Sequence, residues 1–259
     1  MSEFDNAIPG DLVENAAAVR ARVAEAAARV GRHPEDVLIV AVTKTVALER
    51  MLAAARLGFA TFGENRVQEA QEKQDHLRET LGQGQTPTEC AAIRWELIGH
   101  LQTNKAMRAV EQFARIQSVD SVRLAQELDR RAEQFNPDVR LPILLEVNVA
   151  GEASKSGFAP DDVLAVVGAI TNLPHVLPQG LMTVAPLVSD PEEVRPVFRR
   201  LRELRDRLRE TAPQGEDNDG GWRELSMGMT DDYPVAIEEG ATIVRIGRGL
   251  FGARPPAHG

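Results

Sequence analysis

Two patterns of apolar residues alternate along the chain. Short aliphatic runs such as VLIVAV (37–42) and PILLEVNV (142–149) are typical of strands that are buried on both faces of a parallel sheet. Between the runs lie longer stretches whose apolar residues recur every three or four positions, which is the spacing of amphipathic helices. The alternation therefore predicts strand–helix units in a parallel α/β fold.

The predicted strands cover residues 37–42, 59–62, 95–98, 115–119, 142–149, 176–182, 222–227 and 242–246. The predicted helices cover residues 11–30, 48–57, 65–81, 103–112, 122–135, 161–171, 191–211 and 233–239. Eight parallel units in a chain of 259 residues close into a barrel more readily than they form two open sheets. We therefore expect one domain over residues 1–259, a (β/α)8 TIM barrel with an extra N-terminal helix at 11–30 and a flexible loop at 213–221.

The amino-acid composition argues against several classes of binding partner and of structural feature. A formal net charge of -9 argues against nucleic acid or an acidic membrane as a general partner, because phosphate groups attract positive surfaces. The single cysteine, Cys90, excludes an internal disulfide, and the five histidines show no paired ligand spacing, so we expect no metal site. We find no secretory pattern and no run of membrane-spanning length. The working expectation is a monomer in the cytoplasm.

The first apolar run ends on Lys44, directly after a threonine. Taken alone, a lysine in this position is most simply a solvated residue. However, several later strands also end in polar residues or glycines, in the segments FGEN, IGHLQTNK, VNVAGEASKSG, LMT and LSMGMT. Ligands bind at the carboxyl ends of strands in parallel α/β folds, so these groups are expected to converge with Lys44 on one mouth.

The last predicted strand and its loop, VRIGRGLFG, indicate an anion site. Strand alternation directs Arg245 into the barrel lumen, and Gly247 opens the loop that follows. Phosphates in barrels commonly bind between the loops after strands seven and eight, which here carry Ser226 and Gly247. A lysine opposite such a site suits an aldehyde-bearing phosphate ester, and pyridoxal 5'-phosphate (PLP) is a ligand of that kind.

The chain also resembles the pyridoxal phosphate homeostasis protein family. The resemblance runs in order through AVTK, FGENRVQE, WELIGHLQTNK, SVDS, GEASKSGF, GLMT, LSMGMTDD and VRIGRGLFG, which cover nearly the whole chain. It implies a barrel like the amino-terminal domain of alanine racemase, with PLP held by Lys44 as a reversible aldimine. It also implies that the phosphate is cradled by Ser226, Met227, Gly247 and Arg248.

The resemblance assigns further contacts around the cofactor ring. Arg245 would face the pyridine nitrogen and Asn65 would contact the ring edge. Arg248 stands where many relatives carry a threonine, which leaves a backbone contact but puts a hydroxyl contact in doubt. Lys155, in GEASKSGF, is either a second lysine that accepts or passes on the cofactor or a basic residue that attracts phosphate.

These assignments bear on whether the chain is an enzyme. An arginine at the pyridine nitrogen leaves that nitrogen unprotonated, so the ring is a weak electron sink. A racemase of this fold also needs a second base, which in alanine racemase resembles a tyrosine from a separate domain that we do not expect here. The only tyrosine, Tyr233, is expected to be a partly exposed packing residue. His100 is either a general base or, as we prefer, a residue that hydrogen-bonds across the lumen.

The sequence therefore favours a PLP carrier without robust turnover, which acts in vitamin B6 and amino-acid balance. Apo PLP-dependent enzymes are the expected recipients of the cofactor. A PLP-dependent amino-acid racemase or lyase remains the alternative. A third hypothesis is an aldolase in which Lys44 attacks a sugar phosphate directly.

Overall fold

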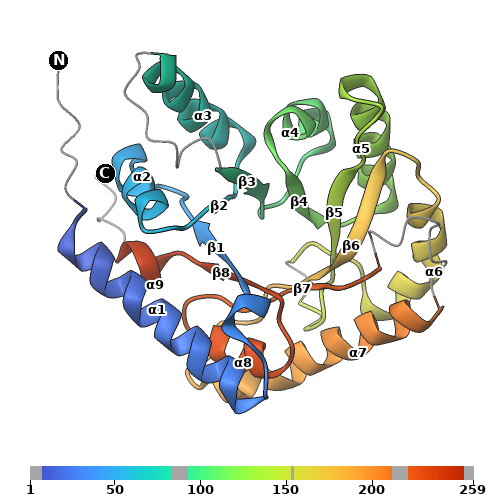
Figure 1. The fold of residues 1–259 in the computed structure, drawn as a ribbon. Helices are drawn as coiled ribbons and strands as arrows, with labels where there is room; N and C mark the ends of the chain where they lie inside the picture. The colour runs from blue at the N-terminus through green and yellow to red at the C-terminus, as the bar shows by residue number, and fades with distance from the viewer. Residues whose placement is uncertain (1–7, 83–92, 153–154, 212–220, 254–259) are drawn as a thin grey trace.

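Eight parallel strands close into a barrel in the computed structural model, which describes residues 8–82, 93–152, 155–211 and 221–253. The strands follow one another around the barrel in chain order, and the last pairs with the first (Figure 1). The strands are β1 (Leu38–Val42), β2 (Thr61–Glu64), β3 (Arg94–Leu97), β4 (Arg115–Val119), β5 (Leu141–Glu146), β6 (Val176–Met182), β7 (Glu224–Ser226) and β8 (Ile243–Ile246). The predicted (β/α)8 architecture is confirmed.

Helices follow the strands and surround the barrel (Figure 1). The α-helices are α1 (Gly10–Arg29), α2 (Leu48–Arg56), α3 (Val67–Gly82), α4 (Ala106–Gln112), α5 (Val122–Phe135), α6 (Pro160–Thr171), α7 (Arg195–Thr211), α8 (Tyr233–Glu238) and α9 (Arg248–Phe251). The 3-10 turns are η1 (Pro34–Asp36), η3 (Thr103–Lys105) and η4 (Pro191–Val194). The expected extra helix before the first strand is α1, which packs against α8 and α9.

Some element boundaries differ from the prediction for local reasons. The fifth strand ends at Glu146 rather than at residue 149, and the next residue, Val147, forms an isolated bridge with Phe158. The seventh strand begins at Glu224 rather than at residue 222, because Trp222 adopts a positive φ of 48° that belongs to no strand. The long helix predicted over 191–211 divides into η4 and α7.

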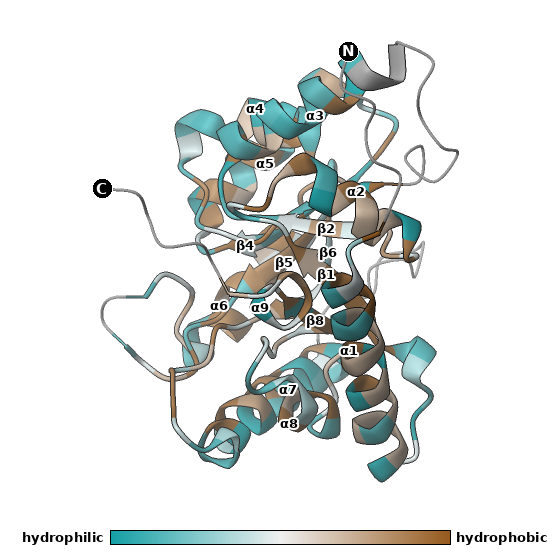
Figure 2. Cartoon of the chain, turned by 90° about the vertical axis from the view of Figure 1, so that its left-hand side faces the viewer, coloured by the Kyte–Doolittle hydropathy of each residue, from teal (hydrophilic) through white to brown (hydrophobic). Residues whose placement is uncertain are grey.

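The main apolar core lies between the strands and the helices. Strand residues such as Phe62 and Leu97 join helix residues such as Leu128 and Phe198 in one buried cluster. In Figure 2 β5 is largely brown and β2 is pale, whereas helices such as α3 and α7 carry teal segments. Because alternate side chains of a strand point to opposite faces, this core uses one face of each strand.

The other face of the strands points into the barrel lumen. There a second, smaller cluster consists of strand residues alone, namely Val40, Leu144, Met182 and Ile243. Gly63 belongs to the same face, because a Cβ at this position would approach a Val40 methyl group to 2.8 Å. The lumen is therefore packed with side chains and is not a pore.

The arginine-rich helix α7 packs one face into the core through Phe198, Leu201, Leu204 and Leu208. Its arginines also meet Glu239, which lies just after α8 and is 4% exposed. Arg199 donates to this carboxylate at 2.9 Å, and Arg202 lies 2.9 Å from it. These arginines therefore tie two helices together.

Two regions with sequence-based predictions fall outside the described residues. Cys90 belongs to the segment 83–92. The predicted flexible loop at 213–221 belongs, except for its last residue, to the segment 212–220. The description of one domain over 1–259 likewise stays a prediction.

Candidate functional site

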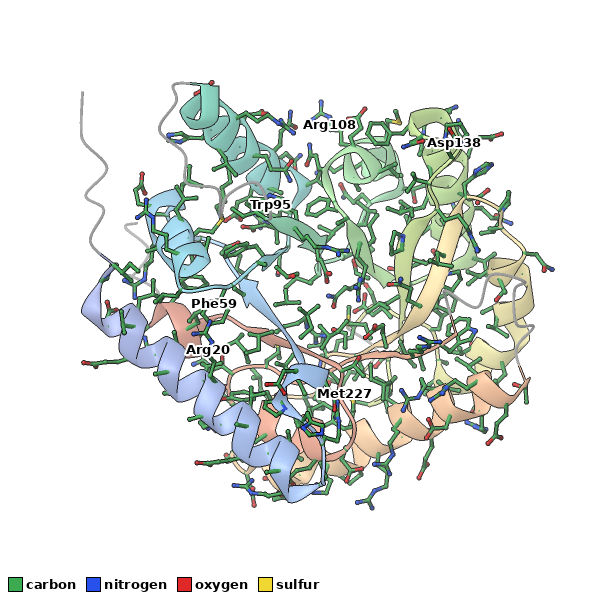
Figure 3. The ribbon with its side chains drawn as sticks, in the orientation of Figure 1. Arg20, Phe59, Trp95, Arg108, Asp138 and Met227 are labelled. Atoms are coloured by element: carbon green, nitrogen blue, oxygen red, sulfur yellow. The ribbon has the colours of Figure 1, made fainter. Side chains whose placement is uncertain are left out.

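A cavity of about 520 Å³ opens at the carboxyl ends of the strands. It is lined by Lys44 after β1, by Thr230 after β7, and by Arg245 and Gly247 at the end of β8. A second cavity of similar size lies at the opposite end of the barrel, near Arg20 and Phe59. Figure 3 labels these two residues between α1 and the barrel. We assign the functional site to the first cavity, because parallel barrels bind ligands at their carboxyl ends and because it contains Lys44.

Lys44 is half-buried and stands on a loop that the barrel holds in place. The preceding Thr43 is fully buried, and its hydroxyl donates to Glu64 Oε1 at 2.6 Å. Lys73 on α3 donates to the Thr43 carbonyl oxygen and to Glu64 Oε1, each at 2.6 Å. The backbone on the amino-terminal side of Lys44 is therefore fixed by β2 and α3.

The carboxyl-terminal side of Lys44 is fixed as well. Thr45 adopts a positive φ of 63°, and its backbone N–H donates to Glu69 on α3 at 2.5 Å. Glu69 also accepts from Lys73 at 3.0 Å, so the same α3 side chains hold both neighbours of Lys44. Burial raises the pKa of Glu64, although the hydrogen bonds from Lys73 and Thr43 act in the opposite direction.

The loops after β7 and β8 meet at the opposite wall. The backbone N–H of Gly249 donates to Thr230 Oγ1 at 3.2 Å. Arg248 Nη2 lies 2.5 Å from Asp231 Oδ2, and both side chains are more than half exposed. Thr230, Gly247 and Arg248 therefore place a hydroxyl, a glycine backbone and a cation on one side of the cavity.

Arg245 lies at the floor of the cavity and is 3% exposed. Its Nη1 donates to Ser226 Oγ at 2.5 Å and its Nη2 donates to the Thr183 carbonyl oxygen at 2.8 Å. Burial lowers the pKa of Arg245 to about 10, while Glu146 and Asp232 favour its charged form. The guanidinium is therefore cationic at neutral pH. The prediction that Arg245 points into the lumen is confirmed.

Two residues predicted to cradle the phosphate do not line the cavity. Ser226 is fully buried, and its hydroxyl contacts Arg245 and Gln117. Met227 is also fully buried and belongs to the main apolar core; Figure 3 labels it in the interior. The same loop reaches the cavity slightly later, through Met229 and Thr230.

The reason is a turn at Gly228. Gly228 has a φ of 91°, and a Cβ at this position would lie 2.6 Å from the Ala236 side chain and 2.9 Å from the Tyr233 backbone. Only glycine fits this close approach, which redirects the loop. The segment LSMGMT carries two hydroxyl side chains. Its threonine, Thr230, lines the cavity, whereas its serine, Ser226, does not.

Lys155 is not among the residues that line the cavity, but it lies close to its rim. Its Nζ donates to Glu152 Oε1 at 2.6 Å and to the carbonyl oxygens of Val184 and Ala185 at 3.4 and 3.3 Å. Val184 itself lines the cavity. Lys155 therefore connects the loop after β5 to the chain after β6.

Two other candidate bases lie outside the cavity lining. His100 Nδ1 is 3.0 Å from Asp120 and 3.4 Å from the Ser156 hydroxyl, and the histidine side chain is 57% exposed. The prediction that Tyr233 is partly exposed is wrong. Tyr233 is 1% exposed, because it is covered by the core and by Arg22, whose guanidinium lies 5.0 Å from the ring centre.

Sequence reasoning also missed residues from more distant elements. Arg50 on α2 lines the cavity, and its guanidinium bonds to Asp11 on α1. Gln117 on β4 contacts Ser226 across the lumen. Neither residue follows a strand end, so the search for polar strand ends did not find them.

Within the described ranges, no cluster of three or more histidine, cysteine or acidic side chains is arranged to hold a metal ion. In the same part of the chain, no helix has the length and apolar content to cross a bilayer.

Comparisons with known proteins place this chain in a family. Residues 15–255 match the alanine racemase N-terminal domain. The pyridoxal phosphate homeostasis protein of Aquifex aeolicus is 40% identical over 241 residues, which are 93% of this chain and 97% of the relative. The protein of the same name from Pseudomonas aeruginosa is 40% identical over 243 residues, 94% of this chain and 96% of the relative. The chain belongs to the pyridoxal phosphate homeostasis protein family.

Solved structures agree with this family assignment. PipY of Synechococcus elongatus PCC7942, in a structure without PLP, has a TM-score of 0.76 and 36% identity, with 90% of this chain and 100% of PipY covered. A structure of PipY with PLP bound has a TM-score of 0.73 at the same identity, covering 89% and 100%. Alanine racemase from Corynebacterium glutamicum has a TM-score of 0.66 at 15% identity, with 95% of this chain and 63% of the racemase covered. The racemase shares the fold alone.

Proposed function

We propose that this member of the pyridoxal phosphate homeostasis protein family binds PLP in the cavity around Lys44 and holds it covalently through that lysine. The observation that carries the proposal is the pairing of Lys44 with Arg245, Thr230 and Gly247 in one cavity. The solved structure of PipY with PLP bound, at 36% identity, supports it.

The donors of the cavity fit the chemistry of PLP. The ligand carries an aldehyde, a phosphate and a pyridine nitrogen, and the cavity offers an amine, a hydroxyl and buried or half-buried cations. Its volume of about 520 Å³ falls within the range of small-molecule sites, roughly 300–1,000 Å³. Bound there, PLP supplies an aldehyde that condenses reversibly with a primary amine and releases water.

Each part of the site has a distinct task. Thr230 and the backbone at Gly247 and Arg248 would hold the phosphate. Arg245 would donate to the pyridine nitrogen and, being cationic, would keep that nitrogen from gaining a proton. Asn65 lines the cavity, where its side chain would contact the ring edge.

We further propose that the chain stores PLP and hands it to apo PLP-dependent enzymes in the cytoplasm, acting as a monomer without robust turnover. An unprotonated ring is a weak electron sink, which disfavours chemistry at an amino-acid α-carbon. The buried Tyr233 is not among the residues that line the cavity, so it does not supply the second base of a racemase. Lys155 at the rim attracts the anionic ligand or receives it on release.

A titration with PLP tests binding. We expect the wild-type protein to gain a visible absorption band, Lys44→Ala to show none, and Lys105→Ala to keep it. Lys105 is a suitable control because it pairs with exposed Gln68 at 3.1 Å and is not among the lining residues. A band that survives in Lys44→Ala would contradict the proposal. A colourless wild-type protein that binds a sugar phosphate would instead support the aldolase hypothesis.

A second experiment separates a carrier from an enzyme. The PLP-loaded protein is incubated with amino acids in deuterated water and, separately, with an apo PLP-dependent enzyme. We expect cofactor transfer without deuterium incorporation at the α-carbon. Rapid incorporation that is lost in Lys44→Ala would favour a racemase or lyase.

A further inference from the structure

A line of buried polar side chains crosses the barrel lumen beneath the cavity. It begins at Arg245 on β8, whose Nη1 donates to Ser226 Oγ on β7 at 2.5 Å. Ser226 donates to Gln117 Oε1 on β4, also at 2.5 Å, and the Gln117 amide donates to Glu96 on β3. We call these four residues the lumen chain.

The donors and acceptors of the lumen chain all run in one direction. A serine hydroxyl has one proton, so Ser226 can accept from Arg245 and donate its own proton to Gln117. The carbonyl oxygen of Gln117 accepts the hydrogen bond from Ser226. The NH2 group of the same side chain then donates a hydrogen bond to the Glu96 carboxylate. A cation stands at one end and a carboxyl group at the other, so each bond polarises the next.

Burial makes the lumen chain costly unless it is complete. Arg245 is 3% exposed, Glu96 is 1% exposed, and Ser226 and Gln117 are fully buried. A buried polar side chain that loses its partner destabilises the fold. Beside the lumen chain, the lumen holds the apolar cluster of Val40, Leu144, Met182 and Ile243. At the far end of the lumen chain, the Nε of Arg115 on β4 lies 3.4 Å from the Glu96 carboxyl group.

A second set of bonds holds Arg245 from the other side. Its Nη2 donates to the Thr183 carbonyl oxygen at 2.8 Å, and the Thr183 hydroxyl donates to the Val147 carbonyl oxygen at 2.7 Å. The backbone N–H of Arg245 donates to the Gly228 carbonyl oxygen at 3.0 Å. With Ser226 bonded to Nη1, the guanidinium is held at both of its terminal nitrogens.

We propose that Ser226 and Gln117 are positioning residues that fix the Arg245 guanidinium at the floor of the cavity, with Glu96 as their anchor. This inference rests on the proposed function, because it assigns the lumen chain to the residue that faces the PLP ring. It also gives Ser226 a role different from the phosphate contact that the sequence predicted.

The test measures PLP affinity and the pH dependence of the visible absorption band. The variants are Ser226→Ala, Gln117→Leu and Arg245→Gln. The control is Ser118→Ala, which removes a buried hydroxyl from the next position on β4, where it bonds to the Gly99 carbonyl oxygen at 2.7 Å. Denaturant unfolding without PLP checks that each variant is folded. If Ser226→Ala does not fold, Gln117→Leu provides the test of the lumen chain in its place.

We expect Ser226→Ala and Gln117→Leu each to weaken PLP binding roughly tenfold, the effect of one lost hydrogen bond to a charged group. A displaced guanidinium also allows the pyridine nitrogen to gain a proton. The pH profile of the band should therefore shift toward that of Arg245→Gln in both variants and stay unchanged in Ser118→Ala.

Double variants distinguish positioning from general loss of structure. In an Arg245→Gln background, Ser226→Ala should have no further effect on affinity or on the pH profile, because its target is gone. Full additivity, or single variants that behave like Ser118→Ala, would overturn the inference. If the wild-type protein binds no PLP, the proposed function fails. If it binds PLP and only Arg245→Gln alters the band, the inference about the lumen chain alone fails.

Discussion

The two faces of the barrel strands are buried to a similar degree but are built differently. The outer face joins the helices in an apolar core that includes Leu128 and Phe198. The inner face combines a small apolar cluster with the hydrogen-bonded lumen chain from Arg245 to Glu96. An apolar core tolerates changes of side chain and mainly stabilises the fold. A chain of hydrogen-bonded side chains instead fixes the position of each donor and acceptor in it. We infer that stability comes mainly from outside the barrel and site geometry from inside it.

The largest expected effect is on the outer face. Phe198→Ala removes a fully buried ring on α7 and should lower the free energy of unfolding by about 3–5 kcal/mol. Because the residue packs in the outer core and does not take part in the lumen chain, the PLP affinity of the folded fraction should stay unchanged. Urea unfolding and a PLP titration check the two statements. A large loss of affinity in folded protein would show that the two faces are not separable.

A smaller effect is expected where the outer shell itself is polar. Glu239→Gln should lower the free energy of unfolding by about 1–2 kcal/mol at neutral pH, since its arginine partners are partly exposed. Burial opposes ionisation of Glu239, but hydrogen bonds from Arg199 and Arg195 outweigh it, and the pKa lies below its usual value.

The sign of the pH dependence follows from that direction. A carboxyl group with a lowered pKa stabilises the fold above its unfolded pKa, about 4.3 for glutamate, and loses this contribution as the pH falls through the folded pKa. The difference between wild type and Glu239→Gln should therefore be complete at pH 7 and shrink in acid. A difference that grows as the pH falls would contradict this assignment.

The smallest effect on stability is expected in the lumen. Arg245→Gln should change the free energy of unfolding by only about 1 kcal/mol, because the lost hydrogen bonds are offset by removal of a buried charge. PLP affinity should nevertheless fall at least roughly tenfold, which corresponds to about 1.4 kcal/mol of binding free energy. If Arg245→Gln lost as much stability as Phe198→Ala and kept its PLP affinity, the proposed contrast between the outer and inner faces of the strands would be wrong.

The same contrast explains what the sequence could predict. The apolar periodicity that builds the outer core also marks the eight strands, and β4, β6 and α5 were predicted to the residue. Lys44 was found because it follows a strand, and Arg245 was found because the alternation of β8 directs it into the lumen. Each of the two residues belongs to a local pattern of a few consecutive residues.

The parts that were missed depend on contacts between distant elements. Gln117 and Ser226 are 109 residues apart, and no local pattern pairs them. Thr230 replaces Ser226 at the cavity only because Gly228 turns the chain, which requires knowledge of its approach to Ala236. Tyr233 was expected to be partly exposed because its neighbours are acidic, yet the helix that carries it packs under α1.

The most direct measurement of the central claim traps the cofactor on the chain. Wild-type protein loaded with PLP is reduced with borohydride, digested and mapped by mass spectrometry, with Lys155→Ala and Lys44→Ala treated in parallel. We predict the added mass on Lys44 in the wild type and in Lys155→Ala, and no added mass at a defined position in Lys44→Ala. Stoichiometric modification of Lys155 or any other lysine in the wild type, with Lys44 unmodified, would contradict the account.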